Sequence, residues 1–209
     1  MQIIQQYFPD LTDKQIKQFA SLEQLYKDWN AKINVISRKD IDNLYEHHIL
    51  HALSLGILLR FEPNADILDL GTGGGIPGIP LAILFPDVKF TLIDGTRKKI
   101  HVVQEIITAI GLDNAKAQQM RAEEWKGKKF DFVVSRAVAN LDKLVPWSKQ
   151  LLKKRHYHAY PNGLFALKGG DVKAEIKALP TAEYTEIFPL SEIFDLAYYE
   201  EKYVVYVQV

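Results

Sequence analysis

Apolar positions in the first third of the chain recur at steps of three and four residues, which predicts amphipathic helices. Thr12 and Gln15 fit a capping box at the start of the first helix. The apolar positions that follow are Ile16, Phe19, Leu22, Leu25, Tyr26, Trp29 and Ile33. After a polar turn over residues 34–40, a second helix is predicted from about Asp42 to Arg60. Because neither helix can bury its apolar face alone, we expect both to pack as a cap on the rest of the chain.

The pattern changes after residue 60, where short apolar runs alternate with amphipathic segments. Strands are predicted over residues 67–70, 89–94, 115–120, 130–135, 164–167, 183–189 and 202–209. Helices are predicted over about 77–85, 96–110, 141–152 and 172–179. This alternation is typical of an α/β fold with a mostly parallel sheet, and the last two strands predict an antiparallel edge. We therefore expect a Rossmann-like seven-stranded domain over residues 61–209, with residues 1–60 as an N-terminal helical cap.

Composition narrows the classes of protein that remain. Basic and acidic residues are equal in number, at 26 each, which neither implies nor excludes a polyanionic partner. The absence of cysteine excludes disulfides, thiolate metal sites and a cysteine nucleophile within this chain. The histidines show no spacing typical of metal ligands. No apolar run reaches membrane-spanning length and no secretory signal is visible, so we expect a cytoplasmic protein, and we expect a monomer.

The segment ILDLGTGGGIPGIPLA, at residues 67–82, is the strongest candidate for a binding site. A strand is followed by a glycine-rich turn and by a helix that opens near Pro77, an arrangement typical of nucleotide-like ligands at the carboxyl end of a parallel sheet. Glycine lets a ligand approach the backbone closely. Gly73, Gly75 and Gly78 form a G-x-G-x-x-G pattern, which alone is a weak signal.

Two carboxylates help to decide which ligand the glycine-rich turn binds. Asp69 lies at the end of the first predicted strand and Asp94 at the end of the second. An acid beside the loop repels a pyrophosphate but suits an ammonium group, and an acid after the second strand suits ribose hydroxyls. S-adenosylmethionine, a cationic amino acid joined to a nucleoside, fits both. The alternative is that Asp69 and Asp94 only cap helices.

The chain resembles the bacterial ribosomal RNA small-subunit methyltransferase G family, also called glucose-inhibited division protein B. The matching stretches are NVISRKD (34–40), HHIL (47–50), ILDLGTGGGIPGIPLAI (67–83), FTLIDGTRKKIHVV (90–103), RAEEW (121–125), FDFVVSRAVANL (130–141) and FALKG (165–169). Together they span most of the chain and are far more specific than one glycine motif. The resemblance implies a class I methyltransferase fold, S-adenosylmethionine as cofactor, and formation of 7-methylguanosine in 16S rRNA of the small ribosomal subunit.

The resemblance also implies roles for single residues. Gly71, Gly73 and Ile76 would belong to the cofactor site in the loop, and Ala122 and Glu123 would border the adenine. Arg136 would reach the cofactor and the target base. The chain departs from the family pattern after His48, where His51-Ala52 stands in place of an Asp-Ser pair, and any role of that aspartate is in doubt here.

The expected chemistry needs little besides positioning. Methyl transfer to guanine N7 is an in-line displacement on a nitrogen that has no proton to lose, so no general base is required. Arg136 and Lys168 are the candidate catalytic residues, acting on the base or on an RNA phosphate. The alternatives are that Arg136 only pairs with Asp69 or Glu123, and that Lys168 is a surface lysine.

Competing functions stay open at this point. A methyltransferase of the same fold could act on a small molecule or a protein, a nicotinamide-dependent oxidoreductase could use the glycine loop, and a non-catalytic module could bind RNA. Basic residues with interleaved tyrosines, at 97–101 and 149–160, suit RNA but equally suit solvated helix ends.

Overall fold

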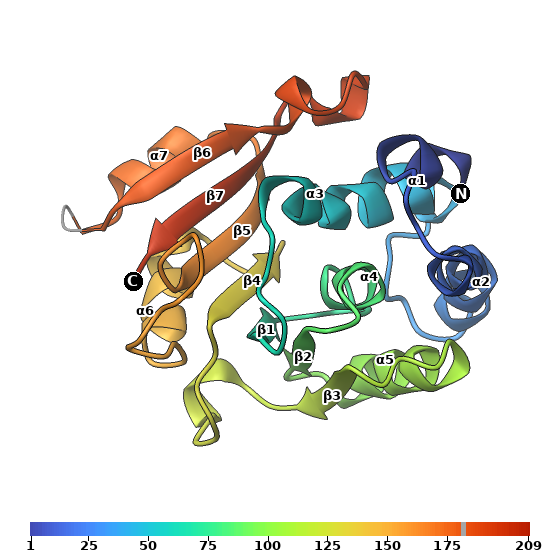
Figure 1. Cartoon of the computed structure of the whole chain (residues 1–209), viewed down its shortest axis with the longest axis horizontal. Helices are drawn as coiled ribbons and strands as arrows, with labels where there is room; N and C mark the ends of the chain where they lie inside the picture. The colour runs from blue at the N-terminus through green and yellow to red at the C-terminus, as the bar shows by residue number, and fades with distance from the viewer. Residues whose placement is uncertain (181–182) are drawn as a thin grey trace.

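The computed structural model describes residues 1–180 and 183–209, and a seven-stranded sheet forms its centre (Figure 1). The strands are β1 (Asp66–Leu70), β2 (Lys89–Asp94), β3 (Ala115–Gln119), β4 (Phe132–Arg136), β5 (Gly163–Gly169), β6 (Thr185–Pro189) and β7 (Lys202–Gln208). Their order is β3-β2-β1-β4-β5-β7-β6. β1 to β5 are parallel, and β7 is antiparallel to both β5 and β6. The predicted mostly parallel sheet with an antiparallel edge is confirmed.

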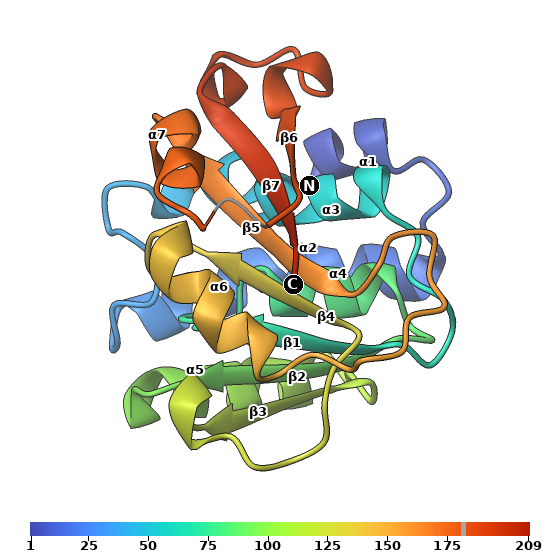
Figure 2. The same cartoon turned by 90° about the vertical axis from the view of Figure 1, so that its left-hand side faces the viewer.

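Helices cover both faces of the sheet, as Figures 1 and 2 show. α3 (His51–Leu58), α4 (Gly78–Leu84) and α5 (Arg97–Ala109) lie on one face, and α1 (Gln2–Tyr7) and α2 (Asp13–Asn30) lie outside them. α6 (Leu141–Lys149) and α7 (Val172–Lys177) lie on the other face. None of the helices in the described part of the chain has both the length and the apolar character needed to cross a bilayer.

The N-terminal helices pack against the helices and sheet of the remaining chain. Thr12 and Gln15 form the expected capping box at the start of α2. Phe19, Leu22 and Tyr26 of α2 are fully buried in one apolar cluster with residues of α4, α5 and the sheet. This burial, rather than helix propensity, supplies most of the stability of such helices.

The second predicted helix is not one regular α-helix. It begins as a 3₁₀ turn (Ile41–Asn43), continues as the wider helical segment η2 (Leu44–Leu50), and becomes α-helical only in α3, which ends at Leu58 rather than Arg60. Such wide turns are rare and occur frequently at functional sites. Apolar spacing alone could not reveal the irregularity, because it fits an α-helix over the whole segment.

The other differences are at element ends. β5 begins at Gly163, one residue before the predicted strand, and extends past Leu167 to Gly169. Gly163 pairs with Gln208, and a Cβ there would lie 2.6 Å from the Val207 carbonyl oxygen, so close strand contact explains the glycine. α6 ends at Lys149 rather than at residue 152.

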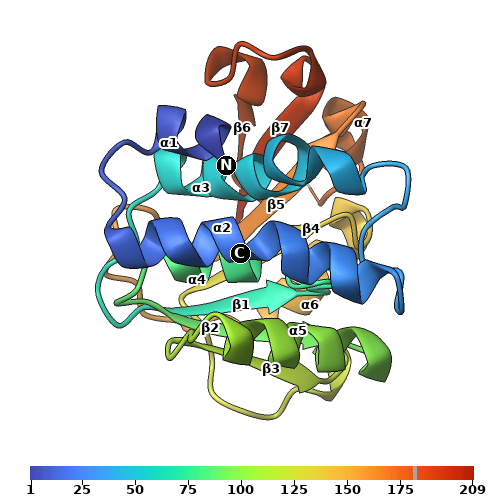
Figure 3. The same ribbon diagram turned by 90° about the vertical axis from the view of Figure 1, so that its right-hand side faces the viewer.

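The connection after α2, over residues 31–43, lies at the end of the sheet toward which β1 points (Figure 3). The glycine-rich turn after β1 begins at that same end. Ligands of open α/β sheets bind at the carboxyl ends of the strands. The fold therefore places the glycine-rich turn and the connection after α2 at the same end of the sheet.

Candidate functional site

The glycine-rich turn between β1 and α4 is held from inside by Asp69. This carboxylate is fully buried, and its Oδ2 accepts hydrogen bonds from Thr72 Oγ1 at 2.5 Å and from Gly78 N at 2.8 Å. Gly71, Gly73 and Gly75 have φ values of 71°, 58° and 97°, in the left-handed region that favours glycine. The turn therefore depends on both its glycines and its internal acid.

The cap also contacts this turn. Tyr26 Oη of α2 donates a hydrogen bond to the Gly74 carbonyl oxygen at 2.8 Å. A Cβ on Gly74 would lie 2.9 Å from the Cβ of Val35, so the connection after α2 packs directly on the loop backbone. Asn30 Oδ1 fixes that connection by accepting from the backbone N–H groups of Val35 and Ile36.

Asp94 lies at the mouth of a cavity of about 340 Å³ at the carboxyl ends of β1 and β2. Its Oδ2 accepts from Gly73 N at 3.1 Å and its Oδ1 from Thr96 N at 2.7 Å. Gly71, Ala122 and Glu123 line the same cavity. Four of the predicted cofactor residues are thus brought together at one site.

Asp69 does not lie where the sequence analysis expected. We predicted that it faces the same hollow as Asp94, but it lies behind the turn and caps the start of α4 through Gly78, as the alternative interpretation had it. Its Oδ1 has no hydrogen-bond partner within the described residues. Burial raises the pKa of Asp69 to about 7, although Thr72 and the Gly78 amide oppose that shift.

Ile76 also differs from its expected place. It is 3 % exposed and belongs to the apolar core cluster, and it does not line the cavity beside Asp94. Its backbone N–H donates to the Thr72 carbonyl oxygen, so its contribution is to the shape of the turn. Gly73 does not line the cavity, but its backbone N–H donates a hydrogen bond to Asp94, which does.

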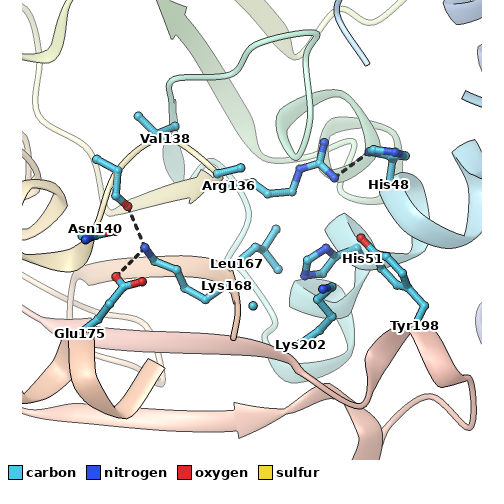
Figure 4. Close-up of a pocket in the computed structure, with 13 residues that line it drawn as sticks. His48, His51, Arg136, Val138, Asn140, Leu167, Lys168, Glu175, Tyr198 and Lys202 are labelled. Atoms are coloured by element: carbon cyan, nitrogen blue, oxygen red, sulfur yellow. Dashed lines mark hydrogen bonds and ion pairs between the residues drawn. The ribbon is translucent and has the colours of Figure 1, made fainter. Parts of the chain in front are cut away.

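Arg136, at the end of β4, lines a second cavity of about 570 Å³. Figure 4 shows its guanidinium pointing towards His48, with 3.0 Å between Nη1 and His48 Nδ1. A guanidinium only donates, so His48 Nδ1 accepts and His48 Nε2 carries the hydrogen. His48 Nε2 lies 2.7 Å from Asp40 Oδ2, which accepts that hydrogen.

This chain from Asp40 through His48 to Arg136 leaves the arginine charge free of any carboxylate. Burial, and after it Arg136, lowers the pKa of His48 to about 4, so the imidazole is neutral near pH 7. Within residues 1–180 and 183–209 Arg136 makes no ion pair, and the expected alternative of pairing with Asp69 or Glu123 is wrong. The same burial lowers the pKa of Arg136 without removing its charge.

Lys168, at the end of β5, lines this second cavity but is already engaged. Its Nζ donates to the Ala139 carbonyl oxygen at 2.7 Å and pairs with Glu175 Oε2 of α7 at 2.8 Å (Figure 4). Glu175 Oε2 in turn accepts from the backbone N–H of Leu141 at the start of α6. Lys168 is therefore no free surface lysine; it ties β5, α6 and α7 together at the edge of the site.

The two cavities meet at Val138, which lines both. A Cβ on Gly71 would lie 2.3 Å from Val138 Cγ2, so the segment after β4 packs on the bare backbone of the glycine turn. Ala137, just before, has a φ of 55°, an uncommon value for a residue other than glycine. The two cavities therefore share one lining residue at the carboxyl end of the sheet.

Sequence reasoning missed part of the second cavity. It assigned no role to His48, His51, Tyr198 or Lys202, which all line the cavity. The doubled histidine next to the NVISRKD stretch was the available signal for His48. No comparable signal pointed to Tyr198 and Lys202, because they reach the site from the C-terminal strand pair.

A family model described as rRNA small subunit methyltransferase G matches residues 15–196. A protein named ribosomal RNA small subunit methyltransferase G from Flavobacterium johnsoniae is 54 % identical over 206 residues, which cover 99 % of this chain and 97 % of the relative. One of the same name from Bacteroides thetaiotaomicron is 54 % identical over 209 residues, the full length of both.

Solved structures with little sequence identity share the fold. A precorrin-6y C5,15-methyltransferase from Geobacter metallireducens is 10 % identical with a TM-score of 0.55, covering 84 % of this chain and 90 % of that one. A mutant of MtNAS in complex with S-adenosylmethionine is 12 % identical with a TM-score of 0.59, covering 93 % and 76 %. At this identity the likeness bears on the fold alone.

Proposed function

The chain belongs to the rRNA small subunit methyltransferase G family, and we propose that it transfers a methyl group from S-adenosylmethionine to a guanine N7 in the small-subunit rRNA. The observation that carries the proposal is the pair of cavities that meet at Val138. One is lined by the acid and bare backbone that suit a nucleoside cofactor, and the other by an unpaired arginine. A donor and an acceptor for group transfer need this adjacency.

The residues present fit the cofactor. Asp94 uses one lone pair on each oxygen for backbone N–H groups, and a carboxylate has about four such sites, so both oxygens can still accept from ribose hydroxyls. Gly71 lines the cavity with its backbone, and Ala122 and Glu123 line the same cavity and would border the adenine. The unpartnered Oδ1 of Asp69 suits an ammonium group that reaches behind the turn. When bound, the cofactor supplies a methyl group on a positively charged sulfur.

The roles of the protein are to bind and to orient. Guanine N7 carries a lone pair in the plane of the base and loses no proton, so alignment suffices for attack. Arg136 keeps its charge because its partner His48 is neutral, and we assign it to the target nucleotide, at O6 or at a phosphate. The contacts of Lys168 favour a positioning role: it holds Ala139, and with it the segment that carries Val138.

The rest of the chain suits a large RNA substrate. We propose that residues 1–60 act as a cap that completes the site, through the Tyr26 contact and the Asp40–His48 chain, on a domain formed by residues 61–209. The target base would have to leave its stack to reach the Arg136 cavity. We further propose that the protein acts in the cytoplasm as a monomer. A methyltransferase for a small molecule or a protein is the alternative that the test below includes.

The test incubates the protein with cofactor labelled in the methyl group and with small ribosomal subunits, naked rRNA, cell metabolites or cell proteins. We expect label in the subunits or their RNA, as 7-methylguanosine at one position after nuclease digestion and mass spectrometry. Label only in metabolites or proteins would contradict the proposal and support the alternative.

Asp94→Ala tests the cofactor site directly. Hydrogen bonds to charged groups contribute about 1.5–3 kcal/mol each, so we expect the Kd for S-adenosylmethionine to rise about 10- to 100-fold, with RNA affinity unchanged. Calorimetry and RNA filter binding measure the two. Asp87→Ala, at an exposed acid far from both cavities, is the matched control. Equal losses of cofactor and RNA affinity in Asp94→Ala would contradict the assignment.

A further inference from the structure

His51, the first residue of α3, lies in the wall of the Arg136 cavity, and no hydrogen bond within the described residues explains why this polar side chain is buried there. It is 4 % exposed, and neither Nδ1 nor Nε2 has a hydrogen-bond partner within the described residues. Leaving a buried polar group without a partner costs about 1–3 kcal/mol, and buried polar groups are nearly always partnered. A ligand in the cavity that His51 lines would supply the missing partner.

Two cations flank this ring in Figure 4, Arg136 on one side and Lys202 on the other. Lys202 Nζ lies 4.8 Å from the centre of the Tyr198 ring, and within the described residues it makes no ion pair with a carboxylate. Tyr198 and Tyr199 meet the His51 ring edge-to-face, at 6.2 and 6.0 Å between centroids, and fix its orientation. The ring is thus held in place between donors that point into the same cavity.

The protonation state of His51 follows from these neighbours. Burial, and after it the charges of Arg136 and Lys202, keep the pKa of His51 well below its usual value. A neutral imidazole has one donor and one acceptor nitrogen. The ring therefore supplies a hydrogen-bond acceptor in a wall where Arg136 and Lys202 only donate.

We propose that His51 and Lys202 read the Watson–Crick edge of the target guanine, with the imidazole accepting from N1–H and the ammonium donating to O6. This inference rests on the proposed function and extends it to the choice of base. Flipped bases are commonly read along this edge. Because N7 lies on the opposite side of O6 from N1, a guanine held in this way keeps N7 free to face Val138 and the cofactor cavity.

The same pair rejects adenine. Adenine carries an amino group in place of O6, and that donor would meet the Lys202 ammonium without any acceptor between them. The imidazole alone is less selective, because the other tautomer could donate to the bare N1 of adenine. His51 therefore contributes mainly to rate and Lys202 mainly to selectivity.

The first experiment measures methylation of small ribosomal subunits by His51→Leu. Without its acceptor the base N1–H is left unpaired, so we expect kcat/KM to fall about 10- to 100-fold. Thermal melting should show an unchanged or higher Tm, because no bond within the fold is lost and an unpartnered polar group is removed. His51→Asn, whose amide oxygen can accept, should recover part of the rate.

His158→Leu is the matched control, since His158 is a second buried histidine with an unpartnered Nε2 and lies outside both cavities. We expect its kcat/KM per folded molecule to equal that of the unsubstituted protein. A lowered Tm in His51→Leu with unchanged kcat/KM per folded molecule would show a structural role and overturn the proposal.

The second experiment measures selectivity with subunits in which the mapped target guanine is replaced by adenine. The unsubstituted protein should methylate guanine and reject adenine, and Lys202→Met should reduce the guanine-to-adenine ratio of kcat/KM by about tenfold or more, the effect of one good base contact. If the unsubstituted protein labels no RNA, the proposed function itself fails. If it labels guanine, and both variants match it in rate and ratio, only the present inference fails.

Discussion

Lys153, at the amino end of the parallel strands, and Arg136, at their carboxyl end, differ in how their charges are paired. At the amino end, Asp66 and Asp131 share the ammonium of Lys153, at 3.1 and 2.9 Å, and Asp66 also pairs with Lys128. At the carboxyl end, Lys168 pairs with Glu175, but Arg136 has only the neutral imidazole of His48 as its partner, and Asp69 Oδ1 and both nitrogens of His51 have none within the described residues.

We infer from this difference that the charges at the amino end serve stability and that those at the carboxyl end serve function. Although burial raises the pKa of Asp66, its two lysines lower that pKa more, and the net shift is downward, so the ion pairs stabilise the folded state. Unpaired polar atoms cost stability at both ends: Asp131 Oδ1 and His158 Nε2 make no hydrogen bond although they lie 3.7 Å apart, and Asp69 Oδ1 and the His51 nitrogens make none within the described residues. Proteins keep such costs where a ligand supplies the missing partner, and perturbed groups gather at functional sites for this reason. We therefore expect substitutions at the carboxyl end to lower activity and those at the amino end to lower stability.

Arg136→Met should give the largest effect and tests the carboxyl end. Loss of one charge that acts on the reacting group lowers kcat by about 10²–10³-fold in comparable sites, and we expect a fall in this range with subunits as substrate. The Tm should stay equal or rise, because a buried cation without a carboxylate partner is removed. Arg136→Lys should recover little, since an ammonium cannot make the planar two-pronged contact.

Arg60→Met is the control for that variant, because Arg60 is exposed and lines neither cavity. A large loss of Tm in Arg136→Met, with the activity of the remaining folded protein intact, would place Arg136 with the structural charges and remove the contrast between the two ends.

Asp69→Asn tests a buried acid at the carboxyl end through the pH dependence of the unfolding free energy. The pKa of Asp69 is raised by burial to about 7 in the folded protein, so its contribution to stability is fully present below the unfolded value near 4 and is lost as pH rises through about 7. One pKa unit corresponds to about 1.4 kcal/mol, so the unfolding free energy should fall by about 2 kcal/mol between pH 5 and pH 7 from this group. Asp69→Asn should lack that part of the fall.

Urea denaturation of both proteins at several pH values measures the difference. Because Asp69 is fully buried, solvent does not screen its charge. Parallel curves for the two proteins between pH 5 and pH 7 would show that Asp69 is ionised throughout and that its unpartnered oxygen carries no cost.

The sequence predicted the sheet because each strand is a short apolar run between turn residues. The position of Asp94 followed from the strand pattern, since residues that follow parallel strands meet at one edge, whereas Gly71, Ala122 and Glu123 were expected beside it only from the family resemblance. The position of Asp69 could not be predicted in the same way. Whether an acid after a strand faces the ligand or the loop depends on one side-chain torsion, which here Thr72 and Gly78 fix.

The second cavity was predictable only in part. Arg136 follows β4 and was expected at the edge, but its partner His48 and the acid that holds His48 come from the cap, at positions 48 and 40. Tyr198 and Lys202 join them through the antiparallel pairing of β7 with β5. No spacing within the chain encodes contacts that arise from packing a cap and an edge strand against one site.

Lys153→Met tests the amino end and should have the smallest effect. It leaves the fully buried Asp131 with the Asp66 N–H as its remaining close donor. Breaking a buried pair costs about 3–5 kcal/mol, and because Lys153 is 29 % exposed and water can replace it in part, we expect a loss of about 1–2 kcal/mol in unfolding free energy. Lys149→Met, at a pair whose lysine is 65 % exposed, should change the unfolding free energy by less than about 0.5 kcal/mol.

In both variants kcat on subunits should match that of the unsubstituted protein, because neither lysine lines the two cavities. If Lys153→Met instead lowered kcat at unchanged stability, charge pairing at the amino end would serve the reaction, and the division of labour between the two ends of the sheet would be wrong.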